Sequence, residues 1–229
     1  MSVFHFKKIT TASKTWLFPA RPVTIFFLFI SLLLFFFITW YVFISNKHFI
    51  DERVFETIAL HTTHSRTRIM QFITFLGNHE FLIPANLLLI AYFLFQKEKG
   101  FAAKVIVTSL SSLFIMSFLK RSFHRSRPDR SLVEGITNFS FPSGHAFMSV
   151  AFYGLLIWFA AISITNKWLQ RVVIAFLFLL ILTIGFSRIY LRVHYTTDVL
   201  AGFAMSFSWL IILFIIMDTI QAKYVLKRK

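Results

Sequence analysis

The chain contains no cysteine, and it has only nine acidic residues against 24 lysines and arginines. The missing cysteine excludes disulfide bonds, thiolate metal sites and a cysteine nucleophile. Charged residues of both signs make up 14% of the 229 residues, whereas soluble domains average about 25%. Apolar residues make up 57% and include 32 phenylalanines. A soluble core of this size cannot bury so many large apolar side chains, so the composition predicts a polytopic membrane protein.

Features of nucleic-acid-binding proteins are also lacking. The formal net charge is +15, but the sequence has no RNA-binding motif, no zinc-finger spacing and no polar stretch long enough for a soluble module. The basic excess is therefore expected to face lipid headgroups, to orient loops or to bind an anionic substrate. Because no internal repeat or low-complexity linker divides the chain, residues 1–229 are expected to form a single domain.

Six segments approach the length of a membrane-spanning helix, which needs about 20 mostly apolar residues. They are residues 23–45, 81–96, 100–119, 146–166, 172–187 and 199–217. The fifth reaches full length if residues 168–170 or 188–191 are also helical. The first is too long for the apolar core of a cleavable signal peptide, so it is expected to be an uncleaved signal anchor.

A short helix is expected between the first two spans. Residues 68–77 place Ile69, Phe72, Ile73 and Leu76 on one face at helical spacing, which is typical of a helix in the membrane interface. The predicted fold class is therefore all-α, a bundle of six transmembrane helices with one short interfacial helix.

The orientation follows from the distribution of lysine and arginine. With six spans both termini share one side, which carries 13 basic residues against 11 on the other. Six of the nine acidic residues fall on that second side. We therefore expect a protein of the cytoplasmic membrane with both termini in the cytoplasm.

The first cluster of candidate site residues follows the third span, where Lys120 stands seven residues before Arg127 and Pro128 comes next. If the helix continues through this segment, seven residues make about two turns and both cations point the same way. Pro128 then ends the helix. A lysine and an arginine both suit phosphate, although a basic anchor for lipid headgroups explains the cluster equally well.

The second cluster, Pro142–His145, stands directly before an apolar helix. Ser143 is a natural N-cap, and Gly144 lets the backbone approach a ligand. The free N–H groups of such a helix start bind anions, and His145 is placed to give or take a proton beside one. Plain helix capping with an interfacial histidine is the alternative.

The third cluster includes Arg188, His194 and Asp198. The spacing of four puts His194 and Asp198 on one face if the segment is helical. A carboxylate bonded to one ring nitrogen fixes the tautomer and leaves the other nitrogen free to attack. The alternatives are a helix-surface pair, or Asp198 as an N-cap of the last span.

These three clusters lie in loops separated by one helical hairpin, so they face the same side of the membrane. Together they supply two histidines, an orienting carboxylate, phosphate-binding cations and an anion-binding helix start. This inventory suits phosphoryl transfer through a phosphohistidine. No pair of Asp or Glu residues stands near the clusters to hold Mg²⁺ or Zn²⁺, so neither a metal nor another cofactor is expected.

The three clusters, in this order, resemble the signature of the type-2 phosphatidic acid phosphatase superfamily, which includes membrane lipid phosphatases. The resemblance covers residues 120–198 and fills every signature position. It implies that His194 is the nucleophile, that Asp198 orients it, and that His145 protonates the leaving oxygen and then activates water. It also implies that the phosphoryl oxygens are held by Lys120, Arg127, Ser143, Gly144 and Arg188. We expect both histidines to have an ordinary pKa near 6.5. Because their two roles need opposite protonation states, a bell-shaped rate profile is expected.

The expected function is metal-independent hydrolysis of a phosphate monoester or diphosphate on a membrane lipid, at the outer face of the membrane. Phosphatidylglycerol phosphate, phosphatidate and undecaprenyl diphosphate all remain possible substrates, and no oligomeric state is predicted. Two alternatives stay open. One is a transporter of lipid phosphates or anions, and the other is a membrane haem protein with His145 and His194 as axial ligands.

Overall fold

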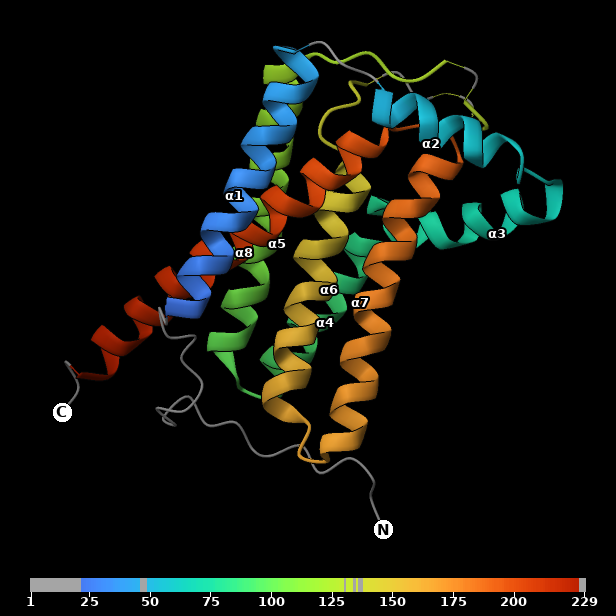
Figure 1. Ribbon diagram of the computed structural model, residues 1–229. Coiled ribbons are helices and arrows are strands. Elements are labelled where there is room, and N and C mark those ends of the chain that lie inside the picture. The colour runs from blue at the N-terminus through green and yellow to red at the C-terminus, as the bar shows by residue number, and fades with distance from the viewer. Residues whose placement is uncertain (1–21, 46–48, 130, 134, 136–137, 227–229) are drawn as a thin grey trace.

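The computed structural model describes residues 22–45, 49–129, 131–133, 135 and 138–226, which form eight helices (Figure 1). The helices are α1 (Pro22–Phe43), α2 (Phe49–Ala59), α3 (His64–Phe75), α4 (His79–Phe95), α5 (Lys99–Phe123), α6 (Gly144–Ser163), α7 (Lys167–Tyr190) and α8 (Thr196–Leu226). The basic N-terminal residues that entered the orientation prediction lie outside the described residues.

Six segments of the described chain are long and apolar enough to cross a membrane, which confirms the predicted number of spans. Five of them are α1, α5, α6, α7 and α8, and the remaining one runs through α3 and α4. The predicted span at residues 172–187 is extended in both directions, because α7 begins at Lys167 and continues to Tyr190. Asn166 caps its start and accepts hydrogen bonds from the backbone N–H groups of Trp168 and Leu169.

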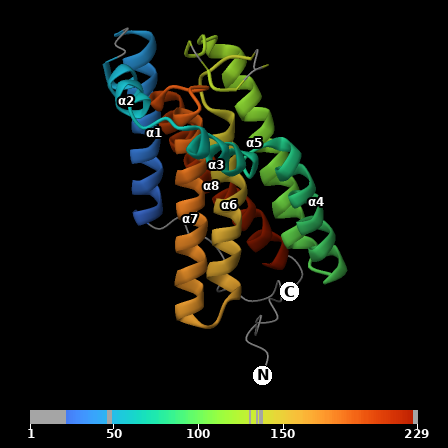
Figure 2. The ribbon, with the colours of Figure 1, turned by 90° about the vertical axis from the view of Figure 1, so that its right-hand side faces the viewer.

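The connection between α1 and α4 contains two short helices where one was predicted. Helix α3 covers most of the predicted residues 68–77. Helix α2 was not predicted, because its four charged residues obscure the apolar face formed by Val54 and Ile58. Both helices lie near the end of the bundle at which α1 ends (Figures 1 and 2).

Helix α6 forms the centre of the bundle and packs against α5, α7 and α8. Twelve of its residues are buried, among them Phe147 and Trp158. Helices α1 and α7 instead expose phenylalanines such as Phe36 and Phe176, each 63% accessible. In a bilayer these rings contact acyl chains rather than water, which explains how the chain accommodates its excess of phenylalanine.

The one charged residue inside the predicted span 100–119, Lys104, is buried against α8. Its Nζ donates a hydrogen bond to Asp218 and lies 4.5 Å from the centre of the Trp158 ring. An isolated charge at this depth is costly, so the ion pair and the aromatic ring allow α5 to carry a lysine among apolar neighbours.

The close approach of α8 to the start of α6 depends on Gly202. A Cβ atom added there would lie 2.8 Å from the carbonyl oxygen of Ser143 and 3.3 Å from the backbone nitrogen of Phe147. Backbone atoms cannot move aside as the end of a side chain can. Gly202 therefore lets α8 bring its first turn against the first turn of α6.

We expect Gly202→Ala to destabilise the protein by about 1–3 kcal/mol, the usual range for overpacking. Gly154→Ala is the matched control on the same helix pair, because its added Cβ would meet only the flexible side chain of Leu210. There the gain in helix propensity, about 0.5–1 kcal/mol, offsets most of the strain. Thermal unfolding in detergent checks both variants, and equal melting temperatures would contradict this account of the α6–α8 contact.

Candidate active site

The eight candidate site residues lie at one end of the bundle, opposite the end at which α1 begins and α8 terminates (Figure 1). Six of them line a single cavity, namely Lys120, Arg127, Gly144, His145, Arg188 and His194. The other two, Ser143 and Asp198, are completely buried. The three sequence clusters therefore meet in space.

The helix that carries Lys120 extends past the predicted span 100–119 but does not reach Arg127. Helix α5 stops at Phe123, and His124 takes a left-handed conformation with φ of 47°. The condition for both cations to point the same way, a helix that continues to Pro128, is not met, so Arg127 does not lie two turns along a helix from Lys120. The left-handed residue redirects the chain instead, and Arg127 approaches the cavity from the following loop.

Lys120 and Arg127 nevertheless bind the same short segment. Lys120 Nζ donates to the carbonyl oxygen of Phe139 at 2.8 Å, and Arg127 Nε donates to that of Asn138 at 2.7 Å. Arg127 also donates to the Asn138 side-chain oxygen. Residues 138–139, which were not among the predicted site residues, thus hold two cations side by side.

A third cation comes from the last turn of α7. Arg188 is 4% accessible, and its Nη1 donates to Thr74 Oγ1 on α3 at 2.7 Å. Its Nε has no hydrogen-bond partner among the described residues. A buried guanidinium with an unpaired N–H is suited to bind an anion in the cavity.

The start of α6 adds backbone donors to this end of the cavity. Ser143 caps the helix as predicted, since its Oγ accepts a hydrogen bond from the Ala146 N–H at 3.5 Å. Its own N–H donates to the carbonyl oxygen of Asp198 at 3.0 Å. Gly144 and His145 open the first turn and line the cavity. The positive end of the helix dipole therefore faces the three cations across a space suited to an anion.

His194 and Asp198 are not arranged as the sequence predicted. Helix α8 begins at Thr196, so His194 precedes the helix and only Asp198 belongs to it. Nδ1 of His194 lies 3.6 Å from Asp198 Oδ2, which is too long for a good hydrogen bond. The hydroxyl of Ser140 lies between them, 3.3 Å from Nδ1 and 2.5 Å from Oδ2.

The neighbours of His194 determine which ring nitrogen carries the proton. Arg127 Nη1 lies 3.3 Å from Nε2, and a guanidinium can only donate. Nε2 must therefore accept, and the proton lies on Nδ1, which donates to Ser140. Ser140 in turn donates to Asp198. The lone pair of Nε2 is left on the side of Arg127 and the cavity.

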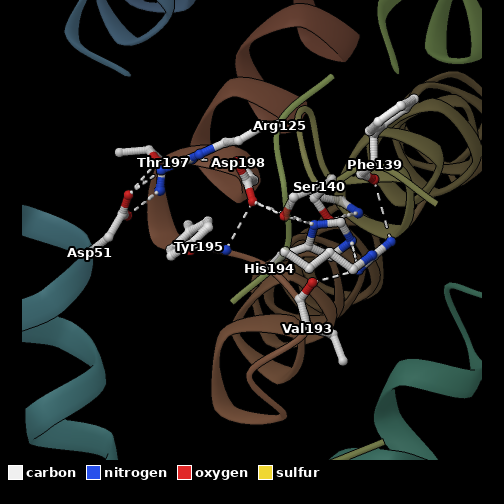
Figure 3. Close-up of polar contacts among 12 residues, drawn as sticks. Asp51, Arg125, Phe139, Ser140, Val193, His194, Tyr195, Thr197 and Asp198 are labelled. Atoms are coloured by element: carbon white, nitrogen blue, oxygen red, sulfur yellow. Dashed lines mark hydrogen bonds and ion pairs between the residues drawn. The ribbon is translucent and has the colours of Figure 1, made fainter. Parts of the chain in front are cut away.

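Asp198 has further donors, which Figure 3 shows around its carboxylate. Arg125 Nη1 donates to Oδ1 at 2.5 Å, and the Tyr195 N–H donates to Oδ2 at 2.9 Å. On its other side Arg125 pairs with Asp51 of α2 at 2.9 Å. Both oxygen atoms of this buried carboxylate therefore accept hydrogen bonds.

Three residues of this site, Asp51, Arg125 and Ser140, were not predicted as site residues. A signal for Asp51 was present, because it lies three and seven residues before Val54 and Ile58 and so interrupts an apolar helical face with a carboxylate. No feature of the sequence distinguished Arg125 from the neighbouring basic residues. Nothing in the sequence indicated that Ser140 separates the histidine from its carboxylate.

Burial lowers the pKa of both His194 and its neighbour Arg127. Complete burial lowers the pKa of His194 from 6.5 to about 3, despite the opposing effect of Asp198. Burial also lowers the pKa of Arg127 to about 10. At neutral pH His194 is therefore neutral and Arg127 is charged. The expectation of an ordinary histidine pKa does not hold for His194.

The cavity continues from the cations between α4 and α5 and has a volume of about 1050 Å³. Its far part is apolar, lined by Leu82 and Ile90 of α4 and by Leu110 and Leu113 of α5. The space therefore joins a cationic end to an apolar groove, which suits a molecule with a phosphate head and a hydrocarbon tail. In the described part of the chain, no three His, Cys, Asp or Glu side chains are placed to hold a metal ion.

The chain is similar to known membrane lipid phosphatases in sequence. Residues 101–222, just over half of the chain, match the PAP2 superfamily. The chain is 29% identical over 157 residues to phosphatidylglycerophosphatase B of Bacillus subtilis (strain 168), which covers 68% of this chain and 77% of the relative.

Two solved structures share the fold. One is a transmembrane PAP2-type phosphatidylglycerolphosphate phosphatase from Bacillus subtilis, with a TM-score of 0.75 and 24% identity over 86% of this chain and 97% of that one. The other is LpxE of Aquifex aeolicus, with a TM-score of 0.52 and 24% identity over 76% of this chain and 95% of that one. The chain therefore shares its arrangement of helices with both solved structures.

The lowered pKa of His194 predicts an acid-sensitive fold. Between about pH 6.5 and pH 3 the unfolded chain binds a proton that the folded His194 does not, so stability falls as the pH falls. His194→Asn removes this titration while keeping a donor for Ser140. We expect its melting temperature to fall less than that of wild type between about pH 7 and pH 4.5. A parallel fall in both proteins would show that His194 titrates alike in the folded and unfolded states.

Proposed function

The chain belongs to the PAP2 superfamily and is a lipid phosphatase, and we propose that it hydrolyses its substrate by transferring the phosphoryl group to His194. One observation carries this proposal. Nε2 of His194 faces a cavity with three cations, while Nδ1 is tied through Ser140 to a buried carboxylate. A neutral imidazole oriented in this way is a nucleophile aimed at the only strongly cationic part of the cavity.

In the first step, Nε2 of His194 attacks the phosphorus atom and the bond to the lipid oxygen breaks. His145 gives a proton to that oxygen as it leaves. The charge that develops on the phosphoryl oxygens is stabilised by Lys120, Arg127, Arg188 and the backbone of Gly144 and His145 at the α6 start. Ser143, whose N–H is already bound to the Asp198 carbonyl oxygen, caps this helix start rather than binding the phosphoryl group directly. The imidazole then bears the phosphoryl group on Nε2 and a proton on Nδ1, and Asp198 stabilises its positive charge through Ser140.

In the second step, His145, now neutral, takes a proton from water as the water oxygen attacks phosphorus. The N–P bond breaks, inorganic phosphate forms and His194 returns to its neutral state. The same residue thus acts as acid and then as base. This cycle consumes one water molecule and uses no group beyond the side chains already described.

The substrate class follows from the shape of the cavity. The groove between α4 and α5 is apolar and reaches the cations, so a lipid tail can lie in it while the headgroup phosphate reaches His194. The named activity of the Bacillus relative makes phosphatidylglycerol phosphate the first substrate to test, before phosphatidate and undecaprenyl diphosphate.

The two alternatives are less well supported. A transporter does not need a histidine held by a serine and a carboxylate, and the family assignment favours an enzyme. As a haem ligand, His194 would have to leave its present neighbours, because a guanidinium lies 3.3 Å from Nε2, the nitrogen that carries no proton.

Hydrolysis of the three lipids by protein purified in detergent tests the proposal. We expect release of inorganic phosphate, little change on addition of a chelator, and inhibition by vanadate, which mimics the transferred phosphoryl group. Activity that a chelator abolishes and Mg²⁺ restores would contradict the phosphohistidine route.

The rate that is lost when His145 is replaced should depend on the leaving group of the substrate. His145→Ala removes proton transfer, which typically contributes a factor of about 10²–10⁴. The loss in the first step should shrink for an aryl phosphate, whose leaving oxygen needs little protonation. Burst kinetics with an aryl and an alkyl phosphate check this. A loss of equal size for both in the first step would remove His145 from the role of general acid.

We also propose that the site faces the outside of the cytoplasmic membrane, with both termini in the cytoplasm. Glu56 is exposed on α2 near the site, and Lys167 is exposed at the opposite end of the bundle. Because the chain has no cysteine, single variants can be labelled without background. An impermeant thiol reagent should label Glu56→Cys but not Lys167→Cys in intact cells, and the reverse pattern would invert the orientation.

A further inference from the structure

One carboxylate near the site takes no part in the proposed reaction. Asp51 lies in the first turn of α2, far in sequence from the other site residues, yet it is completely inaccessible to solvent. Its Oδ1 accepts from the Thr197 N–H at 3.0 Å, and its Oδ2 accepts from Thr197 Oγ1 at 2.8 Å. Oδ2 also accepts from Arg125 Nη2 at 2.9 Å.

Arg125 joins Asp51 to the carboxylate that supports His194. Its Nη1 donates to Asp198 Oδ1 at 2.5 Å and to Thr197 Oγ1 at 2.8 Å. The guanidinium lies over the Tyr195 ring, 4.1 Å from its centre, and the side chain is 8% accessible. Figure 3 shows the resulting line of residues, from Asp51 on α2 through Arg125 and Asp198 towards His194.

The charges along this line have a consequence for the reaction. Asp198 and Arg125 alone would sum to zero, so the imidazolium of a phosphohistidine would meet no net negative charge. With Asp51 included, two carboxylates share one guanidinium and the group carries one negative charge. Formation of the phosphohistidine then neutralises the group in a buried environment, where an unbalanced charge is costly.

Apolar packing also attaches α2 to the bundle. Val54, Phe55 and Ile58 of α2 pack against a cluster that includes Ile189 and Val199. Replacing the buried pair of Asp51 and Arg125 together by apolar side chains would remove two charges from this buried region. A buried ion pair adds little to stability compared with such packing, so stability alone does not account for an aspartate at this position.

We propose that Asp51 is a positioning residue for the phosphoryl transfer: through Arg125 it fixes Asp198 and supplies the negative charge that balances phosphorylated His194. This inference rests on the proposed role of His194 as the nucleophile. It assigns to α2, which lies outside the segment of the family match, a direct influence on the rate of the chemical step.

The test compares three variants, and Asp198→Asn as a fourth for reference, in detergent with the best lipid substrate. Asp51→Asn keeps the shape and an acceptor for the Thr197 N–H but removes the charge. We expect its kcat to fall about 10- to 100-fold, as loss of a nearby buried charge implies, with KM within about twofold because Asp51 lines no part of the cavity. Glu52→Gln, an exposed neighbour on α2, is the matched control and should keep wild-type kcat.

The third variant, Asp51→Asn/Arg125→Gln, restores one negative charge behind His194. We expect its kcat to exceed that of Asp51→Asn, whereas a purely structural role predicts a further loss. It leaves no buried cation without a partner, so it stays informative if the single variant does not fold. In that case its kcat should still exceed that of Asp198→Asn by at least about tenfold.

Single-turnover formation of phosphoenzyme separates this inference from the proposed function. If wild type is phosphorylated on His194 and Asp51→Asn is phosphorylated at the same rate, the role of Asp51 is overturned while the nucleophile stands. A double variant no faster than Asp198→Asn also overturns it. If wild type forms no phosphohistidine, the proposed function itself fails.

Discussion

The structure around the cavity is organised by one requirement, that the buried carboxylate of Asp198 be fully hydrogen-bonded. Removing a carboxylate from water costs several kcal/mol unless donors replace the lost hydration. Here the donors come from the loop after α5, from the segment before α6 and from the residue before α8, namely Arg125, Ser140 and the Tyr195 N–H. Satisfying this one group therefore brings together the three segments that carry the site.

The same arrangement gives His194 two opposite electrostatic sides. On the Nδ1 side lie Ser140 and the carboxylates, and on the Nε2 side lie Arg127 and the other cations of the cavity. In the proposed reaction, an anionic phosphoryl group is attracted to the second side, and the positive charge of the phosphorylated ring is stabilised from the first. Because the pKa of the ring is lowered by burial, the lone pair of Nε2 is available at neutral pH.

Hydropathy predicted all six spans, since crossing a bilayer imposes length and apolarity on each segment separately. The order of the spans also predicted that the three clusters lie at one end of the bundle. Successive loops of a helical membrane protein lie on opposite sides of the membrane, so loops separated by a helical hairpin lie on the same side. The helix end at His124, the insertion of Ser140 and the burial of Asp51 were not predictable in this way. Each depends on contacts between segments distant in sequence, and only for Asp51 was there a local signal, a carboxylate on an apolar helical face.

Identification of the phosphorylated residue tests the account most directly. Wild-type protein mixed with labelled lipid phosphate and quenched in base should carry acid-labile, base-stable phosphate, and fragmentation of the labelled peptide should place it on His194. His194→Ala should carry none. Label at wild-type level in His194→Ala, or label on another residue of the wild-type protein, would contradict the assignment of His194 as the nucleophile and the charge arrangement inferred from it.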